Sequence, residues 1–349
     1  MLLEENKLLA PLTTFQIGGP ARWFATARTE EEVVEAVEWA RKRGVALFVL
    51  GGGSNLLVSD AGYEGLVLRI GLSGVEANGS QGQIVYRVGA GEDWDCFVSR
   101  AVNDKCAGIE CLAGIPGTVG GTPVQNVGAY GQEVATAIDL VRAFDLKQER
   151  FVDFTSSECS FAYRRSRFNT TDRDRFVVTR VDYRLATGGA PTLRYAELQR
   201  AFSEGARPTL KDVSAMVRQI RRSKGMLIEE GLAEYRSAGS FFKNPTVSEE
   251  QVARIESESG KLPPRFPART EPEDAGCVKV PAAWLIEQAG FAKGFAMGAA
   301  GVSTLHTLAL VNRGGATAHD ILALADRIRS SVEVRFGIRL EIEPVLVGF

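Results

Sequence analysis

The sequence is short of the residue types that build metal centres and disulfide frameworks. Among its 349 residues are only two histidines, His306 and His319, in no metal-ligand pattern, and five cysteines with no Cys-x-x-Cys spacing. An odd number of cysteines without that spacing indicates neither a disulfide framework nor a zinc site. We therefore expect no metal centre.

The sequence also lacks a long apolar run and an excess of charge. A transmembrane helix needs a run of about 18 apolar residues or more, and the sequence contains none. The net charge of −2 gives no sign of the basic patch that a nucleic-acid partner requires. The N-terminus, MLLEENKLLAP, carries acidic residues where a signal peptide is basic. These absences predict a cytoplasmic protein that binds neither membrane nor nucleic acid.

Length and patterning predict several domains of mixed α and β structure. A chain of this length is too long for one ordinary core, so two or three domains are expected. Apolar stripes behind capping residues predict helices after Thr29, Thr209, Ser248 and Thr317, and within residues 94–102 and 281–290.

Apolar or alternating runs predict strands at residues 46–50, 56–58, 65–70, 84–90, 139–145, 177–185, 308–311 and 338–343. Those at 139–145 and 177–185 are expected to be half-exposed, and the last strand is expected to return to an earlier sheet. Residues 260–272, with four prolines, are expected to form a loop.

The densest chemical signal is the run AGIPGTVGGTPVQNVGAYG at residues 113–131, which holds six glycines and no charged side chain. Glycine permits positive φ and close backbone approach, and backbone N–H groups bind a pyrophosphate without a formal positive charge. A tight turn between strands explains any one of these glycines equally well, but six in one block favour a phosphate site. The candidate cofactor ligands here are Gly114, Ile115, Pro116, Gly117, Thr118, Gly120, Gly121, Gln125, Asn126, Gly128, Ala129 and Tyr130.

A second glycine cluster supports this interpretation. An apolar run ends in a turn, which adds five candidate ligands: Gly51, Gly52, Gly53, Ser54 and Asn55. No Gly-Lys-Ser/Thr follows, so the turn is not a Walker A motif. The apolar residues after it indicate a strand where a dinucleotide fingerprint needs a helix. Two glycine turns of different type suggest one cofactor whose long phosphate bridge is held from two sides.

Taken together, these stretches resemble the UDP-N-acetylenolpyruvoylglucosamine reductases, the MurB flavoenzymes of bacterial cell-wall synthesis. The matching pieces follow the family's order along nearly the whole chain: 13–15 with 17–19, 51–57, 113–131, 161–164, 239–245 (GSFFKNP) and 340–343.

The resemblance implies a three-domain α+β flavoprotein, with a two-domain FAD-binding scaffold and a separate α+β substrate domain. The expected boundaries are 1–70 for the first FAD-binding subdomain, completed by 338–349, then 71–207 for the second subdomain and 208–337 for the substrate domain. It also implies non-covalent FAD and NADPH as co-substrate.

The implied reaction is reduction of the enolpyruvyl group on UDP-N-acetylglucosamine. Negative charge builds on the carbon beside a carboxylate, so the site needs a cation for the carboxylate, a second polar stabiliser and an acid. The resemblance assigns Arg164 to the first role, Glu343 to the second and Ser240 to the third. From the residues alone, Arg164 also fits a solvated basic patch, Glu341 fits as well as Glu343, and Ser240 fits a turn.

Six further residues are candidates for binding the UDP-sugar or NADPH: Tyr163, Tyr195, Arg221, Lys224, Asn244 and Gln288. Tyr195, in LRYAEL, matches the mobile tyrosine loop of the family's larger type.

Two other classes of protein remain as alternatives. One is another FAD oxidoreductase on the same scaffold, such as an oxidase with covalent flavin. Such enzymes often attach FAD to an N-terminal histidine, and this sequence has no histidine before His306. The other is a non-catalytic nucleotide-sugar binding module, which would keep the glycine turns without needing Arg164, Ser240 and Glu343 together.

Overall fold

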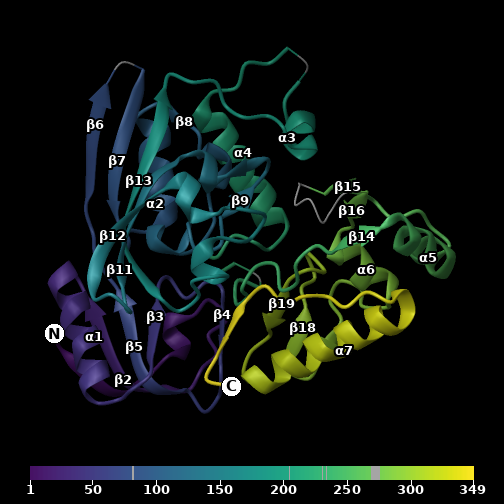
Figure 1. The fold of residues 1–349 in the computed structure, drawn as a ribbon. Helices are drawn as coiled ribbons and strands as arrows, with labels where there is room; N and C mark the ends of the chain where they lie inside the picture. The colour runs from purple at the N-terminus through teal and green to yellow at the C-terminus, as the bar shows by residue number, and fades with distance from the viewer. Residues whose placement is uncertain (81, 204, 230, 233, 269–275) are drawn as a thin grey trace. The chain divides into compact units, whose positions relative to one another are not determined.

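The computed structural model describes residues 1–80, 82–203, 205–229, 231–232, 234–268 and 276–349. Two compact units divide the chain: unit 1 comprises Met1–Lys7, Ala21–Gly53 and Tyr63–Arg222, and unit 2 comprises Leu8–Pro20, Ser54–Gly62 and Ser223–Phe349. Both units mix helices and sheets (Figure 1), which confirms the predicted α+β class. The three domain boundaries given above stay predictions.

The first sheet of unit 1 leads into the glycine turn at Gly51. Its strand order is β1 (Leu3–Leu8), β2 (Pro20–Ala27), β5 (Tyr63–Ile70) and β3 (Leu47–Leu50), and both β2 and β3 run parallel to β5. Helix α1 (Glu30–Lys42) connects β2 to β3 and begins where predicted, because the Thr29 side chain accepts a hydrogen bond from the Glu32 amide.

The second sheet of unit 1 is antiparallel, in the order β12 (Arg150–Thr155), β11 (Ile138–Asp145), β13 (Phe176–Thr187), β7 (Gln83–Gly89) and β6 (Val75–Ser80), with β8 (Cys106–Ala107) paired to β13. Helix α2 (Trp94–Asn103) packs Trp94 and Phe97 against Tyr183, with ring centroids 5.7 and 5.0 Å away. The expected half-exposure of β11 and β13 is wrong, because most of their residues are buried. Consecutive residues point to opposite faces of a sheet, and both Val177 and Val178 belong to the buried core, so both faces of β13 are covered there.

The remaining helices and strands of unit 1 include those that carry Gly120, Gly121, Gly128, Ala129 and Arg221. These are helix α3 (Ala196–Ala201), helix α4 (Leu210–Ser223), the strands β9 (Gly128–Ala129) and β10 (Gln132–Glu133), and the 3-10 helices η2 (Glu110–Leu112), η3 (Val119–Gly121), η4 (Val134–Thr136), η5 (Ser156–Cys159) and η6 (Arg167–Asn169). In Figure 1, α2 and α4 lie on the same side of the strands β6, β7 and β13.

Within the described residues, unit 2 combines helices with two three-stranded sheets and one two-stranded parallel sheet, which is described below. One three-stranded sheet has the order β14 (Thr246–Ser248), β16 (Cys277–Lys279), β15 (Phe266–Pro267), and the other β17 (Ala296–Met297), β18 (Ala300–Val302), β19 (Leu310–Asn312). The helices are α5 (Glu249–Ser259), α6 (Ala282–Gln288), α7 (Ala318–Phe336) and the 3-10 helix η1 (Ala10–Leu12). Capping boxes at Ser248 and Thr317 begin α5 and α7 as predicted. The expected loop at 260–272 contains β15, and its last residues lie outside the described ones.

The final strand differs from the prediction. Residues 338–343 form only one isolated bridge, between Phe242 and Ile342, and the regular strand is β20 (Val345–Val347). Pro344 lacks an N–H group and interrupts the extended run between the two. The expected return to an earlier sheet does not occur as predicted: β20 pairs in parallel with the earlier strand β4 (Leu56–Val58), but the two form a two-stranded sheet of their own.

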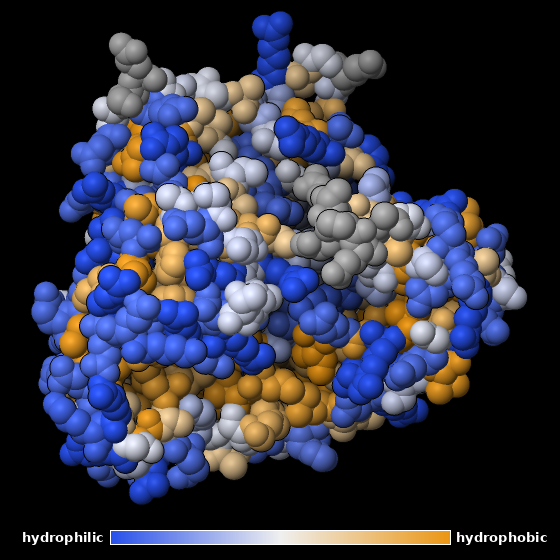
Figure 2. Space-filling view, viewed as in Figure 1, coloured by the Kyte–Doolittle hydropathy of each residue, from blue (hydrophilic) through white to orange (hydrophobic). Residues whose placement is uncertain are grey.

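No helix in the described part of the chain combines the length and apolar character needed to span a bilayer. On the face drawn in Figure 2, hydrophilic side chains predominate.

Candidate functional site

The two glycine turns predicted from sequence lie next to each other in unit 1. A Cβ atom on Gly52 would lie 2.6 Å from the Gly117 Cα and 3.0 Å from the Thr118 nitrogen, and one on Gly51 would lie 3.0 Å from the Thr118 hydroxyl oxygen. Gly53 has φ +67°, a conformation that side chains disfavour. Only glycine at these positions lets the two turns approach so closely.

Hydrogen bonding separates the amides of these turns into two groups. Three already donate within the protein: Gly114 to Asp95 Oδ1 (2.6 Å), Gly120 to Ala90 O (2.8 Å) and Gly121 to Thr118 O (3.0 Å). The amides of Gly52, Gly53, Gly117 and Thr118 donate to no acceptor within the described residues. These four amides remain available to an anion. Ile115 and Pro116, which lie between Gly114 and Gly117 in the sequence, are half-buried.

The end of the glycine block is a hairpin. Tyr130 (φ 48°) and Gly131 (φ 86°) form the two-residue turn between β9 and β10, the geometry in which both central residues need positive φ. A Cβ atom on Gly128 would lie 2.7 Å from the Glu133 Cγ. Gly128 therefore has a structural reason to lack a side chain, while Ala129 ends β9 and Tyr130 sits at the tip of the hairpin.

Asn126 ties this hairpin to the segment that carries Arg164. Its side chain is buried, donates to Ala162 O at 2.9 Å and to Glu133 Oε2 at 3.1 Å, and accepts from the Ala135 amide at 3.2 Å. Gln125 beside it is half-buried.

Arg164 occupies a strained turn. Its φ is 57°, uncommon for a long side chain, within a loop closed by reciprocal backbone bonds between Ala162 and Arg165 of 3.0 and 3.1 Å. Asn169 holds the turn: its side-chain nitrogen donates to Arg164 O at 3.1 Å and its oxygen accepts from the Ser166 amide at 2.9 Å. Strain maintained by such bonds is characteristic of functional sites.

Arg164 belongs to a cationic cluster with Arg221. Arg221, buried on α4, donates from Nε to Gly114 O at 2.9 Å and hydrogen-bonds the Tyr130 hydroxyl. Burial lowers the pKa of Arg221, and the nearby charge of Arg164 lowers it further, while Tyr130 and Asp95 oppose that shift. Two guanidinium groups close enough to affect one another form a site suited to an anionic ligand.

Tyr130 and Tyr195 line the same cluster. Their rings meet edge to face with centroids 5.3 Å apart. Burial raises the pKa of Tyr130 to about 12, with the charge of Arg221 opposing the shift. Burial likewise raises the pKa of Tyr195, which is 41 % exposed. Tyr163 lies beside Arg164, whose guanidinium carbon is 5.5 Å from the Tyr163 ring centroid.

In unit 2, the structure brings the segments of Ser240 and Glu343 together. The Glu343 amide donates to Phe241 O and the Lys243 amide to Glu341 O, each at 2.9 Å. Lys243 Nζ also reaches Glu341 Oε1 at 2.5 Å. The exposed Glu341 is thus held by an ion pair, while Ser240 and Glu343 are half-buried.

Asn55 fixes the backbone around Glu343. Its side chain donates to Glu343 O at 3.3 Å, and its own carbonyl accepts from the Val345 amide at 2.9 Å. Ser54, the preceding residue, accepts a bond from the Thr14 hydroxyl at 3.4 Å on its carbonyl oxygen.

The remaining candidates of unit 2 lie on or beside α6 and at the end of α4. Asn244 Oδ1 accepts from the Ala282 amide at 2.9 Å and so caps α6. Gln288 ends α6, and its carbonyl accepts from Arg335 of α7. Lys224 follows α4 and is half-buried.

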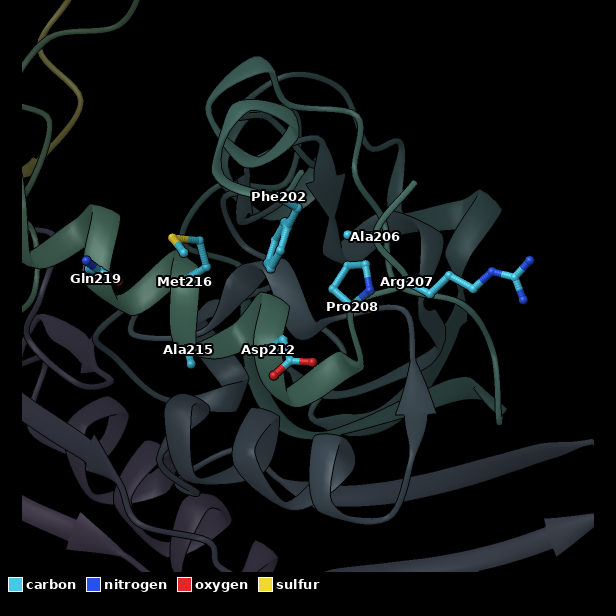
Figure 3. Close-up of a pocket in the computed structure, with 8 residues that line it drawn as sticks. All are labelled: Phe202, Ala206, Arg207, Pro208, Asp212, Ala215, Met216 and Gln219. Atoms are coloured by element: carbon cyan, nitrogen blue, oxygen red, sulfur yellow. The ribbon is translucent and has the colours of Figure 1, made fainter. Parts of the chain in front are cut away.

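A shallow hollow of about 400 Å³ lies elsewhere on α4 (Figure 3). Its lining comes from α4 and the segment before it: Phe202, Ala206, Arg207, Pro208, Asp212, Ala215, Met216 and Gln219. Residues 212, 215, 216 and 219 follow the i, i+3, i+4, i+7 spacing of one helix face, and Arg221 lies on a different face. In Figure 3 the Arg207 side chain extends away from the other lining residues. The hollow contains no candidate residue.

Sequence reasoning missed the residues that support the cluster. Asp95 accepts from the Gly114 amide and pairs with Arg218, one turn before Arg221 on α4. Asp95 stands in the first turn of α2, where an acidic residue is expected for the helix alone, so the sequence carried no separate signal. Asn169 could have been found from the sequence, because its spacing of three residues from Ser166 is that of a capping box, and the two residues do form one at the start of η6.

Comparisons with known proteins define first the class and then the family. Residues 21–147 match the model of an FAD binding domain. Residues 231–347 match the model of the UDP-N-acetylenolpyruvoylglucosamine reductase C-terminal domain.

Full-length relatives agree. The chain is 45% identical to the UDP-N-acetylenolpyruvoylglucosamine reductase of Streptomyces coelicolor, covering 97% of this chain and 89% of that protein. It is 44% identical to the enzyme of the same name from Thermobifida fusca, covering 98% and 97%. The crystal structure of the reductase (MurB) from Thermus caldophilus matches with a TM-score of 0.68 and 28% identity, over 99% of this chain and 100% of that chain. The chain belongs to the UDP-N-acetylenolpyruvoylglucosamine reductase family, which confirms the resemblance seen in the sequence.

Proposed function

We propose that the protein reduces UDP-N-acetylglucosamine enolpyruvate to UDP-N-acetylmuramate with NADPH, through bound FAD, in peptidoglycan precursor synthesis. The observation that carries the proposal is the near full-length match to reductases of that name. The cationic cluster of Arg164 and Arg221 beside the glycine turns supports it.

Non-covalent FAD fits the glycine turns. The amides of Gly52, Gly53, Gly117 and Thr118 are the proposed donors to its pyrophosphate, because they donate to no acceptor within the described residues, whereas the amides of Gly114, Gly120 and Gly121 are used within the protein. The absence of a side chain at Gly52 lets this turn lie directly against the backbone of Gly117 and Thr118. When bound, FAD would supply the hydride chemistry, accepting from NADPH and delivering to the vinyl carbon of the substrate.

Arg164 is the proposed partner of the substrate carboxylate. A guanidinium forks onto a carboxylate through two N–H bonds and stays charged. Asn169 holds the turn that contains Arg164 and so fixes the backbone position from which the Arg164 side chain extends. As hydride adds to the vinyl carbon, charge spreads onto the carboxylate, and a fixed cation stabilises that charge.

Ser240 is the proposed proton donor to the carbon beside the carboxylate, and Glu343 the second stabiliser. Backbone pairing between Phe241 and Glu343 holds their segments together, and Asn55 braces the Glu343 backbone. A carboxyl group that is kept protonated donates a hydrogen bond to a developing enolate. Lys224 is a candidate to stabilise the alkoxide that Ser240 leaves.

Tyr163, Tyr195, Arg221, Asn244 and Gln288 complete the proposed ligand-binding set, for the UDP-sugar or for NADPH. Arg221 and Tyr195 are supported by their place in the cationic cluster. Asn244 keeps its side-chain nitrogen for a ligand, since its oxygen caps α6. We further propose that the enzyme works in the cytoplasm, where no membrane partner is required.

The direct test is product analysis. Purified protein with FAD, NADPH and the enolpyruvyl substrate should yield UDP-N-acetylmuramate, one NADPH being consumed per product formed. A yellow protein that consumes NADPH without this product would point to another flavin oxidoreductase. A colourless protein that binds UDP-sugars without consuming NADPH would point to a binding module.

A further inference from the structure

Glu110 is a buried acidic residue for which the proposed reaction has no use. Its side chain is fully buried in η2 of unit 1. One oxygen, Oε2, accepts from the Gly108 amide at 2.8 Å. The other, Oε1, accepts from the Gln132 side chain and from the Thr192 amide, both at 2.8 Å.

The two partners of Oε1 are themselves joined. Gln132 Nε2 also donates to the Thr192 hydroxyl at 3.1 Å, and Gln132 Oε1 accepts from the Cys111 amide at 2.7 Å. The Cys111 thiol donates to Thr192 O at 3.3 Å. Thr192 is therefore held through its amide, its hydroxyl and its carbonyl, and Glu110 stands at the centre of the network.

Both partners lead directly to tyrosines of the cationic cluster. Gln132 follows Tyr130 by two residues in the hairpin, and Tyr195 follows Thr192 by three. Three residues span at most about 11 Å when fully extended, so the anchor at Thr192 limits where Tyr195 can reach. The hairpin tip also touches this segment, because a Cβ atom on Gly131 would lie 3.1 Å from the Arg194 Cβ.

We propose that Glu110 is a positioning residue that holds Tyr130 and Tyr195 in register for the UDP-sugar substrate. The Glu110 Oε1 atom holds Gln132 and Thr192, the residues that anchor the backbone near Tyr130 and Tyr195. Tyr195 contacts Tyr130, which in turn hydrogen-bonds Arg221. The inference rests on the proposed role of Tyr195 in binding that substrate. It predicts that loss of Glu110 loosens substrate binding more than it slows the chemical step.

The first test is a kinetic comparison of Glu110→Leu with Glu110→Gln. Leucine removes both acceptor oxygens, whereas glutamine keeps one oxygen for Gln132 and Thr192. Glu110→Leu should raise the KM for the UDP-sugar about tenfold, because loss of one hydrogen-bonding contact to a ligand weakens binding by about this factor, with a smaller change in kcat. Glu110→Gln should recover most of the loss.

Asp182→Asn is the matched control. Asp182 is also a buried carboxyl group of unit 1, but its partners are Arg180 and Arg87 on the sheet. Its replacement should leave KM unchanged even where it lowers the melting temperature. If Glu110→Leu fails to fold, Thr192→Val removes only the hydroxyl and should raise KM a few-fold.

The second test needs no activity. Trypsin cleaves after Arg194 and Arg200, which lie on the segment that Thr192 anchors. Without ligand, Glu110→Leu or Thr192→Val should be cut at these two sites at least about tenfold faster than the wild type, while Asp182→Asn is cut at the wild-type rate.

The outcomes separate the two proposals. A wild-type enzyme that forms no product refutes the proposed function, whatever trypsin shows. A wild-type enzyme that turns over normally, with variants of unchanged KM and unchanged cleavage, shows that Glu110 only stabilises the fold and overturns the inference.

Discussion

The proposed role of Ser240 as a proton donor can be distinguished sharply from a purely structural role. A proton donor to carbon is needed only after hydride reaches the substrate, so Ser240→Ala should react with NADPH at close to the normal rate. The second half-reaction, with the enolpyruvyl sugar, should slow by at least about 10², since a positioned acid contributes on the order of 10²–10⁴-fold. Ser240→Cys should recover part of this loss, because a thiol is the stronger acid.

Anaerobic stopped-flow absorbance of the flavin band measures each half-reaction separately. Equal slowing of both halves in Ser240→Ala would make Ser240 a structural residue. A second half-reaction within a few-fold of the wild type would remove it from the mechanism.

Arg164→Lys tests the carboxylate partner. Lysine keeps the charge but loses the fork that matches a carboxylate, so turnover should fall by at least about tenfold while the half-reaction with NADPH stays nearly normal. Arg165→Lys is the matched control, since the neighbouring side chain is exposed. Steady-state turnover of both variants is the measurement, and equal activity would remove Arg164 from the mechanism.

At the scale of elements, the glycine turn offers a paired test. Gly52→Val should empty the flavin site, because its Cβ would lie 2.6 Å from the Gly117 Cα. Gly53→Val should do the same through its positive φ. Gly121→Ala is the control, because a Cβ there meets nothing within 4 Å. The ratio of flavin to protein absorbance measures occupancy, and full retention in both valine variants would rule out this placement.

Gly120 illustrates what the sequence could not resolve about this element. Sequence reasoning takes five of the six glycines of the block, Gly120 among them, as candidate cofactor ligands, yet a Cβ on Gly120 would meet the Ala90 Cβ at 2.7 Å and its amide donates to Ala90 O. Composition locates the turn, but only long-range hydrogen bonds decide which amides remain for a ligand. Asn126 is a second candidate ligand whose polar atoms are already used within the protein, because its side chain donates to Ala162 O and accepts from the Ala135 amide.

Local signals predicted most helices and failed where pairing is non-local. The capping boxes at Ser248 and Thr317 are encoded within four residues, and both helices begin there. At 338–343 the alternation of apolar and charged residues is real, and Ile338 and Leu340 are buried. The segment finds only a single bridge to Phe242, which no local pattern reveals.

For the whole molecule, buried thiols predict a loss of stability in alkali. Burial raises the pKa of the Cys159 thiol from 9.0 to about 12, with Arg167 opposing the shift. Between these values the unfolded chain has released its proton and the folded chain has not, so stability falls as pH rises. The contribution is fully present below pH 9.0, and its slope is about 1.4 kcal/mol per pH unit.

Cys159→Ala should therefore show a shallower decline of unfolding free energy across this window, although its stability near neutral pH is lower. Urea unfolding at several pH values measures both slopes. Parallel slopes for the two proteins would show that Cys159 titrates in the folded state as it does in the unfolded chain.

The proposed flavin-dependent reaction is tested most directly by the visible spectrum of the purified protein during one anaerobic cycle. We predict a yellow protein whose colour is released into solution by acid precipitation, bleached by NADPH, and restored by UDP-N-acetylglucosamine enolpyruvate but not by UDP-N-acetylglucosamine. A protein that stays bleached when the enolpyruvyl sugar is added, or that never binds flavin, would contradict the account.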